Sequence, residues 1–176
     1  MKKALILHAW FSNPTSNWYP WLKGELEKKG YEIWVPELPT MPTENPDMET
    51  MLKFVIEKNF VDESTTVIGH SLGSVLTLRL AERVKFAKGI LFAAWDYNDL
   101  TPEHQSFWRN MMDHKKILSN VSEWVFPLSE NDPYVTIAIA KEVAARLNGK
   151  VIEVGKKGHF GKDDGVKEVP EILEFV

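Results

Sequence analysis

The chain contains no cysteine among its 176 residues. This absence excludes disulfide bonds, thiolate metal sites and a cysteine nucleophile. Because disulfides are what would mark an oxidising compartment, the redox environment of the protein stays open. A nucleophile, if the protein uses one, must come from another residue type.

The chain also lacks an excess of basic residues and a long apolar run. Lys and Arg number 21 and Asp and Glu number 25, so the net charge is −4 and nucleic acid is not an expected partner. No stretch approaches the roughly 20 apolar residues that span a bilayer, so no membrane association is expected. The N-terminal MKKALILHAWF is too short an apolar run for a secretory signal and contains His8. We therefore expect an unprocessed, cytoplasmic protein.

What the chain does have is an alternation of strand-length apolar runs and longer amphipathic segments. Hydrophobic residues make up 44% and charged residues 26%, as in ordinary globular proteins. The strand candidates are Ala4–Leu7, Glu32–Val35, Thr66–Ile68, Gly89–Ala93, Glu123–Pro127 and Val151–Val154. The helix candidates are Trp18–Lys29, Asp47–Lys58, Leu72–Val84, Phe107–Leu118, Val135–Leu147 and Val169–Val176.

This alternation indicates the fold class. The runs ALIL, TVI and GILFAA are continuously apolar, which is typical of strands buried on both faces of a parallel sheet. Strands with helices between them predict an α/β fold, with a doubly wound, mostly parallel six-stranded sheet and helices on both faces. Gly30 and Gly149 stand where a C′ glycine would end a helix. No repeat or long linker interrupts the chain, so residues 1–176 are expected to form a single domain.

The sequence GHSLG around Ser71 matches the G-x-S-x-G pattern of a nucleophile elbow. A buried-type strand precedes it and an amphipathic helix begins at Leu72, which is the context that an elbow requires. Gly69 and Gly73 allow a tight turn, and the helix directs its N-terminal amides toward a developing negative charge. The alternative role for Ser71 is that of a simple helix N-cap. The surrounding pattern favours the nucleophile.

A serine nucleophile needs an imidazole that takes its proton and a carboxylate that orients the imidazole. Polar residues follow the strands at their carboxyl ends, where ligands bind in such sheets. His159, which follows Gly158 after the last strand, is the candidate base. Asp132, after the fifth strand, is the candidate acid and gives the chain order serine, acid, histidine. Asp96, after the fourth strand, and Glu130 are alternative acids.

At this point the sequence resembles a known family. The blocks GHSLG, SENDPYV and GHF, together with LHAWFSNPTSNWYPWLKGELEKKGYEIWVPELP, resemble the small serine hydrolases of the retinoblastoma-binding type over nearly the whole chain. The resemblance implies one minimal α/β-hydrolase domain over residues 1–176, with strand order 2-1-3-4-5-6. It also implies that Ser71 is the nucleophile, Asp132 the acid and His159 the base.

The implied strand order puts the end of the first strand beside Ser71. One oxyanion donor would then be the backbone N–H of Leu72, and the other the backbone N–H of Trp10. Related hydrolases usually carry His-Gly in the first-strand loop, whereas this chain has His8-Ala9. An alanine restricts the backbone more than a glycine, so the second donor depends on the turn at Ala9.

Several strand-end residues are candidates for lining a substrate pocket: His8, Trp10, Trp95 and Tyr134. The histidines show no zinc-ligand spacing, so we expect no metal and no organic cofactor. The expected function is hydrolysis of small carboxylic esters, or of amides or thioesters, through an acyl-enzyme on Ser71. The expected partner is a small ester-like substrate, and the oligomeric state stays open. The alternative is a catalytically silent protein-interaction module on the same fold.

The connection Tyr97–Asn120 leaves the end of the fourth strand, where a lid over the site could lie. It is short, which favours an open site and small substrates. Its two histidines, His104 and His114, are interpreted as surface residues.

Overall fold

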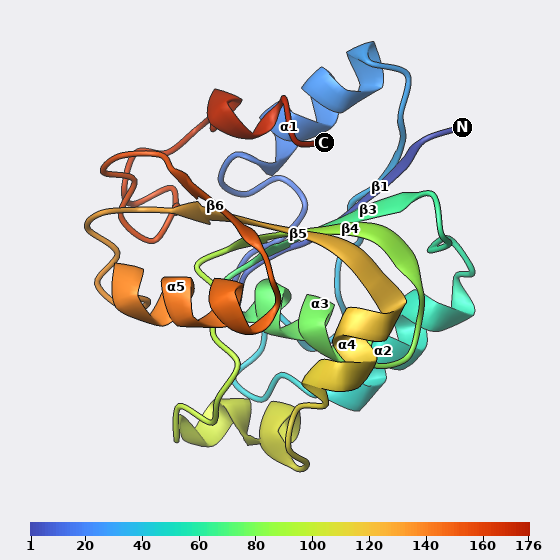
Figure 1. Cartoon of the computed structure of the whole chain (residues 1–176), viewed down its shortest axis with the longest axis vertical. Coiled ribbons are helices and arrows are strands. Elements are labelled where there is room, and N and C mark those ends of the chain that lie inside the picture. The colour runs from blue at the N-terminus through green and yellow to red at the C-terminus, as the bar shows by residue number, and fades with distance from the viewer.

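The computed structural model describes all 176 residues and contains one six-stranded sheet with helices on both faces (Figure 1). Every strand pairing is parallel, and the strand order is β2-β1-β3-β4-β5-β6. The predicted α/β fold and the order 2-1-3-4-5-6 are therefore confirmed. The strands are β1 Lys3–Leu7, β2 Glu32–Trp34, β3 Thr65–His70, β4 Phe86–Phe92, β5 Val121–Leu128 and β6 Lys150–Glu153.

Five α-helices and one 3₁₀ helix connect the strands, and a second 3₁₀ helix follows β6. Helix α1 and the C-terminal segment lie on one face of the sheet, and α2, α3, α4 and α5 lie on the other (Figure 1). The α-helices are α1 Tyr19–Lys28, α2 Met48–Glu57, α3 Leu72–Ala81, α4 His114–Asn120 and α5 Ile137–Arg146, and the 3₁₀ helices are η1 Pro102–Trp108 and η2 Pro170–Ile172.

Helix α2 shows how local sequence sets an element. Its N-cap is Asp47, whose side chain accepts the backbone N–H of Thr50 at 2.9 Å. The buried residues recur at helical spacing, which gives the helix one apolar face toward the core. These residues are Met48, Met51, Leu52 and Val55.

The predicted helix over Phe107–Leu118 is wrong, because the structure has η1 and, after a break, α4. Arg79 of α3 causes the break. Its guanidinium donates to the carbonyl oxygen of Phe107 at 2.9 and 2.6 Å and to that of Asn110 at 2.7 Å. These carbonyl groups are therefore turned away from a continuous helix. Asp113 then begins α4 by accepting the N–H of Lys116 at 3.0 Å.

The predicted C-terminal helix over Val169–Val176 is reduced to the short η2. So short a segment, with Pro170 near its start, gains too few helical hydrogen bonds to nucleate an α-helix. Tertiary contacts hold it instead. The side chains of Lys29 and Lys88 donate to the carbonyl oxygens of Leu173 and Phe175.

The two predicted C′ glycines have different outcomes. Gly30 takes the left-handed conformation after α1, with φ 80°. After α5 the left-handed residue is Asn148, with φ 51°, so the prediction for Gly149 is wrong by one position. The N–H of Gly149 closes the turn on the carbonyl of Ala144 at 2.8 Å. A Cβ at Gly149 would lie 2.3 Å from the Phe126 ring, so space requires glycine there.

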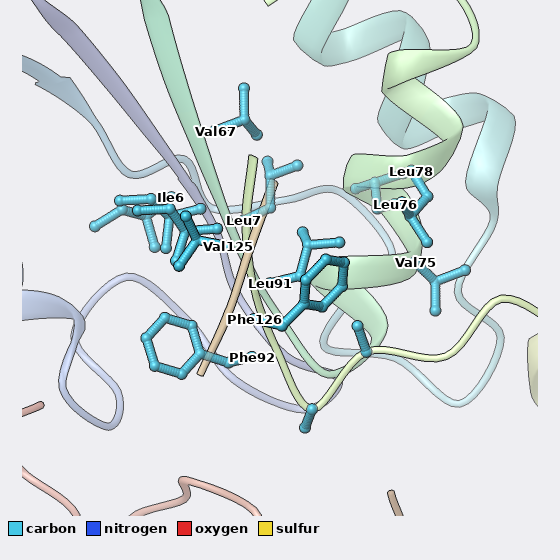
Figure 2. Close-up of a cluster of buried hydrophobic side chains, with 14 of the residues drawn as sticks. Ile6, Leu7, Val67, Val75, Leu76, Leu78, Leu91, Phe92, Val125 and Phe126 are labelled. Atoms are coloured by element: carbon cyan, nitrogen blue, oxygen red, sulfur yellow. The ribbon is translucent and has the colours of Figure 1, made fainter. Parts of the chain in front are cut away.

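Strand β3 and helix α3 are buried along their whole lengths and form the centre of the fold. Figure 2 shows side chains of both elements beside those of β1, β4 and β5. A Cβ at Gly73 would lie 2.2 Å from the carbonyl oxygen of Leu7, and one at Gly69 would lie 2.6 Å from the Cα of Ser74. Gly69 therefore lets α3 lie against β3. Gly73 lets the start of α3 lie directly against the end of β1, which brings Ser71 beside the loop that follows β1.

Candidate active site

Ser71 lies at the turn between β3 and α3 in a strained conformation, with φ 54° and ψ −122°. Residues other than glycine rarely adopt a positive φ, and such strain concentrates at functional turns. The turn is held from both sides. The N–H of Ser71 donates to the carbonyl of Phe92 at 2.9 Å, and its carbonyl accepts the N–H of Ser74 at 2.8 Å. The Ser71 hydroxyl makes no capping hydrogen bond to α3, so it is left for another partner.

That partner is the imidazole of His159. Its Nε2 lies 2.8 Å from Ser71 Oγ, and its Nδ1 lies 2.9 Å from Asp132 Oδ2 and 3.0 Å from Oδ1. A carboxylate only accepts, so the hydrogen of a neutral imidazole is assigned to Nδ1. Nε2 is then free to accept the hydroxyl hydrogen of Ser71. The structure thus brings together the three side chains that the sequence predicted as nucleophile, acid and base.

Further hydrogen bonds hold the Asp132 carboxylate and the backbone of His159 in place. Asp132 is buried, and its Oδ1 also accepts the N–H groups of Tyr134 and Val135 at 2.9 and 3.0 Å. The N–H of His159 donates to Asp164 Oδ2 at 2.9 Å. Asp164 was not predicted, because nothing in the sequence marks a carboxylate that folds back within the same loop.

The alternative acids lie elsewhere. Asp96 is buried and accepts from Arg146 at 2.7 and 2.6 Å and from His114 at 2.7 Å. Burial acts to raise the pKa of Asp96, but the hydrogen bonds from Arg146 and His114 outweigh it and the pKa is lowered. Asp96 therefore belongs to a salt bridge that joins the connection after β4 to Arg146 of α5, with His114 of α4 as a second partner. Glu130 is exposed and makes no contact with His159.

In the loop after β1, the backbone N–H of Trp10 is free, whereas the N–H groups of Ala9, Phe11 and Ser12 are bonded. The N–H of Ala9 donates to Tyr19 Oη at 3.0 Å, that of Phe11 to Met41 O at 3.2 Å and that of Ser12 to Ala9 O at 3.2 Å. The N–H of Trp10 makes no such hydrogen bond, and neither does that of Leu72 at the start of α3. Ala9 itself has no positive φ. The left-handed residue of this loop is Phe11, with φ 53°, so alanine in place of glycine introduces no strain at position 9.

A buried relay of hydrogen bonds, which the sequence did not predict, joins this loop to the His159 loop. Tyr19 Oη lies 2.6 Å from His70 Nδ1, and His70 Nε2 lies 2.7 Å from the carbonyl oxygen of His159. A carbonyl only accepts, so the hydrogen is assigned to Nε2, and Nδ1 accepts from the Tyr19 hydroxyl. The oxygen of Tyr19 in turn accepts from Ala9 and from Asn17 Nδ2, the latter at 3.1 Å.

Burial keeps both members of the relay uncharged. It raises the pKa of Tyr19 to about 12, against the hydrogen bond from Ala9. Burial, with a smaller contribution from the neighbouring His159, also lowers the pKa of His70 to about 3. The relay therefore holds the elbow and the His159 loop together without a fixed charge.

Because His70 stays neutral when folded, acid should destabilise the protein through it. The unfolded chain binds a proton at the ordinary histidine pKa of about 6.5. The folded chain does not bind one until the pH nears 3. Stability should therefore fall from pH 6.5 toward pH 3, by up to about 1.4 kcal/mol per pH unit from this group. Urea unfolding at pH 7, 6, 5 and 4 measures the slope, and His70→Gln should be less steep by that amount. Parallel slopes would contradict the prediction.

The prediction that His8 lines a substrate pocket is wrong. His8 is fully buried, its Nδ1 donates to the carbonyl of Ala9 at 3.0 Å, and its Nε2 accepts the N–H of Leu38 at 3.1 Å. Burial lowers the pKa of His8. The side chain thus ties the loop after β1 to the loop after β2 beneath the surface.

The other pocket candidates, Trp10, Trp95 and Tyr134, do line one cavity of about 770 Å³ that also contains Ser71 and His159. His104 and Asp99 line it as well. His104 is buried, so its interpretation as a surface residue is wrong, because η1 folds back over the strand ends. No group of three or more histidine, aspartate or glutamate side chains is placed to hold a metal ion. No helix has the length and apolar character needed to cross a bilayer.

A parallel sheet in this strand order, with a strained serine between the central strand and its helix, defines the α/β-hydrolase fold. The model of the family described as serine hydrolase matches residues 4–176. The chain therefore belongs to the serine hydrolase family.

Relatives agree with this assignment. The YdeN protein of Bacillus subtilis (strain 168) is 26% identical over 181 residues, covering 99% of this chain and 94% of YdeN. The crystal structure of the ydeN gene product superposes with a TM-score of 0.88 over 99% of this chain and 96% of that chain, at 25% identity. Serine hydrolase RBBP9 of Rattus norvegicus is 28% identical over 149 residues, covering 83% of this chain and 79% of RBBP9.

A more distant structure shares the fold. A carboxylesterase of the thaumarchaeon Nitrososphaera gargenis superposes with a TM-score of 0.75 at 12% identity, over 99% of this chain and 89% of that chain.

Proposed function

We propose that the protein hydrolyses small carboxylic esters through an acyl-enzyme on Ser71, with His159 as general base and Asp132 as the acid that orients it. The observation that carries this proposal is the hydrogen-bonded chain from Ser71 Oγ to His159 Nε2 at 2.8 Å and from His159 Nδ1 to Asp132 Oδ2 at 2.9 Å. Membership of the serine hydrolase family and the carboxylesterase among the fold neighbours support it.

The proton follows this chain. As Ser71 Oγ attacks the ester carbonyl, His159 Nε2 takes its hydrogen, and the buried Asp132 stabilises the imidazolium that forms. His159 then gives the proton to the departing alcohol oxygen, which leaves the acyl group on Ser71. A water molecule then attacks the acyl group, with His159 again taking the proton. His159 returns this proton to Ser71 Oγ as the carboxylic acid is released. Thioesters and amides would react by the same steps with a different leaving group.

The negative charge of the tetrahedral intermediate needs two donors. The free N–H groups of Leu72 and Trp10 are the candidates, since the N–H groups of Ala9, Phe11 and Ser12, which flank Trp10, are already bonded. The relay through Tyr19 and His70 supports this geometry. It ties Ala9, next to Trp10, to the carbonyl of His159, so the oxyanion loop and the base keep their relative positions.

Covalent labelling tests the proposal directly. A fluorophosphonate should add one adduct to the wild-type protein, detected by intact mass, because it reacts with an activated serine. Ser71→Ala should remain unlabelled, since no other serine of the cavity has an imidazole partner. Ser12→Ala is the matched control, because Ser12 lines the same cavity, and it should label like wild type. Labelling of Ser71→Ala would refute the assignment of Ser71 as the nucleophile. An unlabelled but folded wild type would instead favour a protein-interaction module.

A further inference from the structure

Most of the apolar side chains that line the cavity beside Ser71 are flat rings. Its only aliphatic lining residues are Ala9 and Val135, and no leucine, isoleucine or methionine contributes. Several of the rings are exposed although they are apolar: Phe11 is 59% exposed, Tyr97 45% and Tyr134 74%. Exposed aromatic side chains around a cavity are typical of a binding surface, and flat rings favour a flat ligand over a flexible acyl chain. The aromatic lining residues are Trp10, Phe11, Trp95, Tyr97 and Tyr134.

One wall of the cavity also contains a histidine without a complete set of partners. His104 Nδ1 lies 2.9 Å from Asp99 Oδ2, while its Nε2 is buried and has no hydrogen-bond partner. The His104 ring lies 4.8 Å from the ring of Trp10 and 6.0 Å from that of Trp95. The indole Nε1 of Trp95 is likewise buried without a partner. Three other indole nitrogens, of Trp18, Trp108 and Trp124, share this property, but none of them lines the cavity.

The two unpartnered nitrogens are complementary. The Asp99 carboxylate accepts, so the hydrogen of a neutral His104 ring is on Nδ1 and Nε2 presents a lone pair. Trp95 Nε1 presents a hydrogen. A hydroxyl group both donates and accepts, so it can partner either nitrogen. A buried polar group left without a partner is costly, which makes a ligand that supplies the partner favourable.

The wall that bears His104 is held in place by the core. Ser106 of η1 donates to the carbonyl of Pro46 at 2.7 Å and accepts the N–H of Met48 at 3.1 Å. The buried Arg79 binds the carbonyl groups of Phe107 and Asn110, as described above. His104 therefore belongs to a preorganised surface, which limits the entropy cost of binding.

The position of His159 indicates which part of the ester meets this wall. His159 protonates the departing alcohol, so the alcohol lies on the His159 side of Ser71, where the Tyr134 ring is 5.0 Å from the imidazole. The acyl part then extends the other way, toward Trp10, His104 and Trp95.

We propose that Trp10, Trp95, His104 and Asp99 form an acyl subsite for a flat aromatic ring that carries a hydroxyl group. This inference rests on the proposed esterase function and names its substrate class as esters of hydroxyaryl acids. The rings of Trp10 and Trp95 contact the aromatic ring, His104 Nε2 accepts the hydrogen of its hydroxyl, and Trp95 Nε1 donates to the hydroxyl oxygen.

Three p-nitrophenyl esters with one common leaving group test the subsite: those of cyclohexylacetic, phenylacetic and 4-hydroxyphenylacetic acid. Each kcat/KM is divided by the rate constant for hydroxide-catalysed hydrolysis of the same ester, which removes differences in intrinsic reactivity. The phenylacetate should exceed the cyclohexylacetate by about threefold to tenfold through ring contacts. The hydroxylated ester should exceed the phenylacetate by a further factor of about three to ten through its hydrogen bonds.

Variants separate the two contributions. His104→Phe should lose the preference for the hydroxyl and keep that for the aromatic ring. Asp99→Asn removes the carboxylate that fixes the position of the His104 hydrogen, so it should weaken the preference for the hydroxyl. This variant provides the test if His104→Phe does not fold. His114→Phe is the matched control, because His114 also pairs with an aspartate but lies outside the cavity, and it should keep both preferences.

The outcomes distinguish this subsite from the proposed function. Equal normalised values for the three esters, or a hydroxyl preference that survives in His104→Phe, would overturn the subsite. Labelling of Ser71 by a fluorophosphonate without hydrolysis of any of the three esters would overturn the subsite and leave the serine hydrolase activity standing. A folded wild type that is neither labelled nor active would overturn both.

Discussion

Replacing Ser71 by alanine should lower kcat for hydrolysis of p-nitrophenyl acetate by about 10⁶-fold, because the acyl-enzyme cannot form. The hydroxyl of Ser71 makes one interaction, the 2.8 Å contact with His159 Nε2, and caps nothing in α3. The variant should therefore fold and melt like wild type. Residual hydrolysis above the rate in water would come from binding and from the oxyanion donors alone. Stopped-flow or steady-state kinetics, with a thermal melt of each protein, measure the effect.

The same experiment tests whether the three side chains act as one unit. His159→Ala should cost nearly as much as Ser71→Ala, and the double variant should be no slower than either single variant. In His159→Ala the Ser71 hydroxyl has no base, and in Ser71→Ala the imidazole has no hydroxyl to deprotonate. Adding the second substitution to either variant therefore removes no further catalytic step. Additive losses in the double variant would show that His159 acts on something other than Ser71.

Replacing Asp132 by asparagine should lower kcat by about 10⁴-fold while leaving the fold intact. Oδ1 of Asp132 accepts the N–H groups of Tyr134 and Val135, so the amide oxygen of asparagine should take that position. The amide nitrogen then replaces Oδ2, which lies 2.9 Å from His159 Nδ1, while the oxygen that remains 3.0 Å from Nδ1 already accepts two backbone N–H groups. A donor at that point forces the His159 hydrogen onto Nε2, and Nε2 can no longer accept from Ser71.

Asp96→Asn is the matched control for the acid, since Asp96 is also a buried aspartate at a strand end that bonds a histidine. Loss of the Asp96 carboxylate charge weakens the ion pair with Arg146 and should lower the free energy of unfolding by about 1–3 kcal/mol, as measured by urea unfolding. Its kcat should stay near the wild-type value. If Asp96→Asn were nearly inactive and Asp132→Asn were active, the acid would be Asp96 and not Asp132.

Local sequence patterns were sufficient to predict the elements that are mostly buried. The apolar runs of β1, β3 and β4 predicted a parallel sheet, and the GHSLG turn predicted where its central strand meets a helix. The predicted helices failed where a distant side chain decides the outcome. Arg79 breaks the helix expected after Phe107 by binding two of its carbonyl groups, and it is remote from them in sequence.

The two misjudged histidines show the same limit. His8 follows a strand and His104 lies in a surface connection, so strand-end reasoning placed the first in the pocket and the second outside it. In the structure His8 is enclosed by the loop at Leu38, and His104 is folded over the strand ends by η1. Exposure depends on which loops cover a residue, and loop paths have no periodic sequence pattern that predicts them.

By itself, then, the sequence determined the α/β class with a parallel sheet, the turn at Ser71 and a short choice of acids and bases, because these follow from local periodicity, turn-forming glycines and chain order. Only the tertiary structure decided among them. It paired Asp132 with His159, committed Asp96 to Arg146, left the Trp10 N–H free by bonding its neighbours, and linked Tyr19 to His70. These are contacts between residues far apart in the chain, and their partners are selected by distance and burial, which no local pattern encodes.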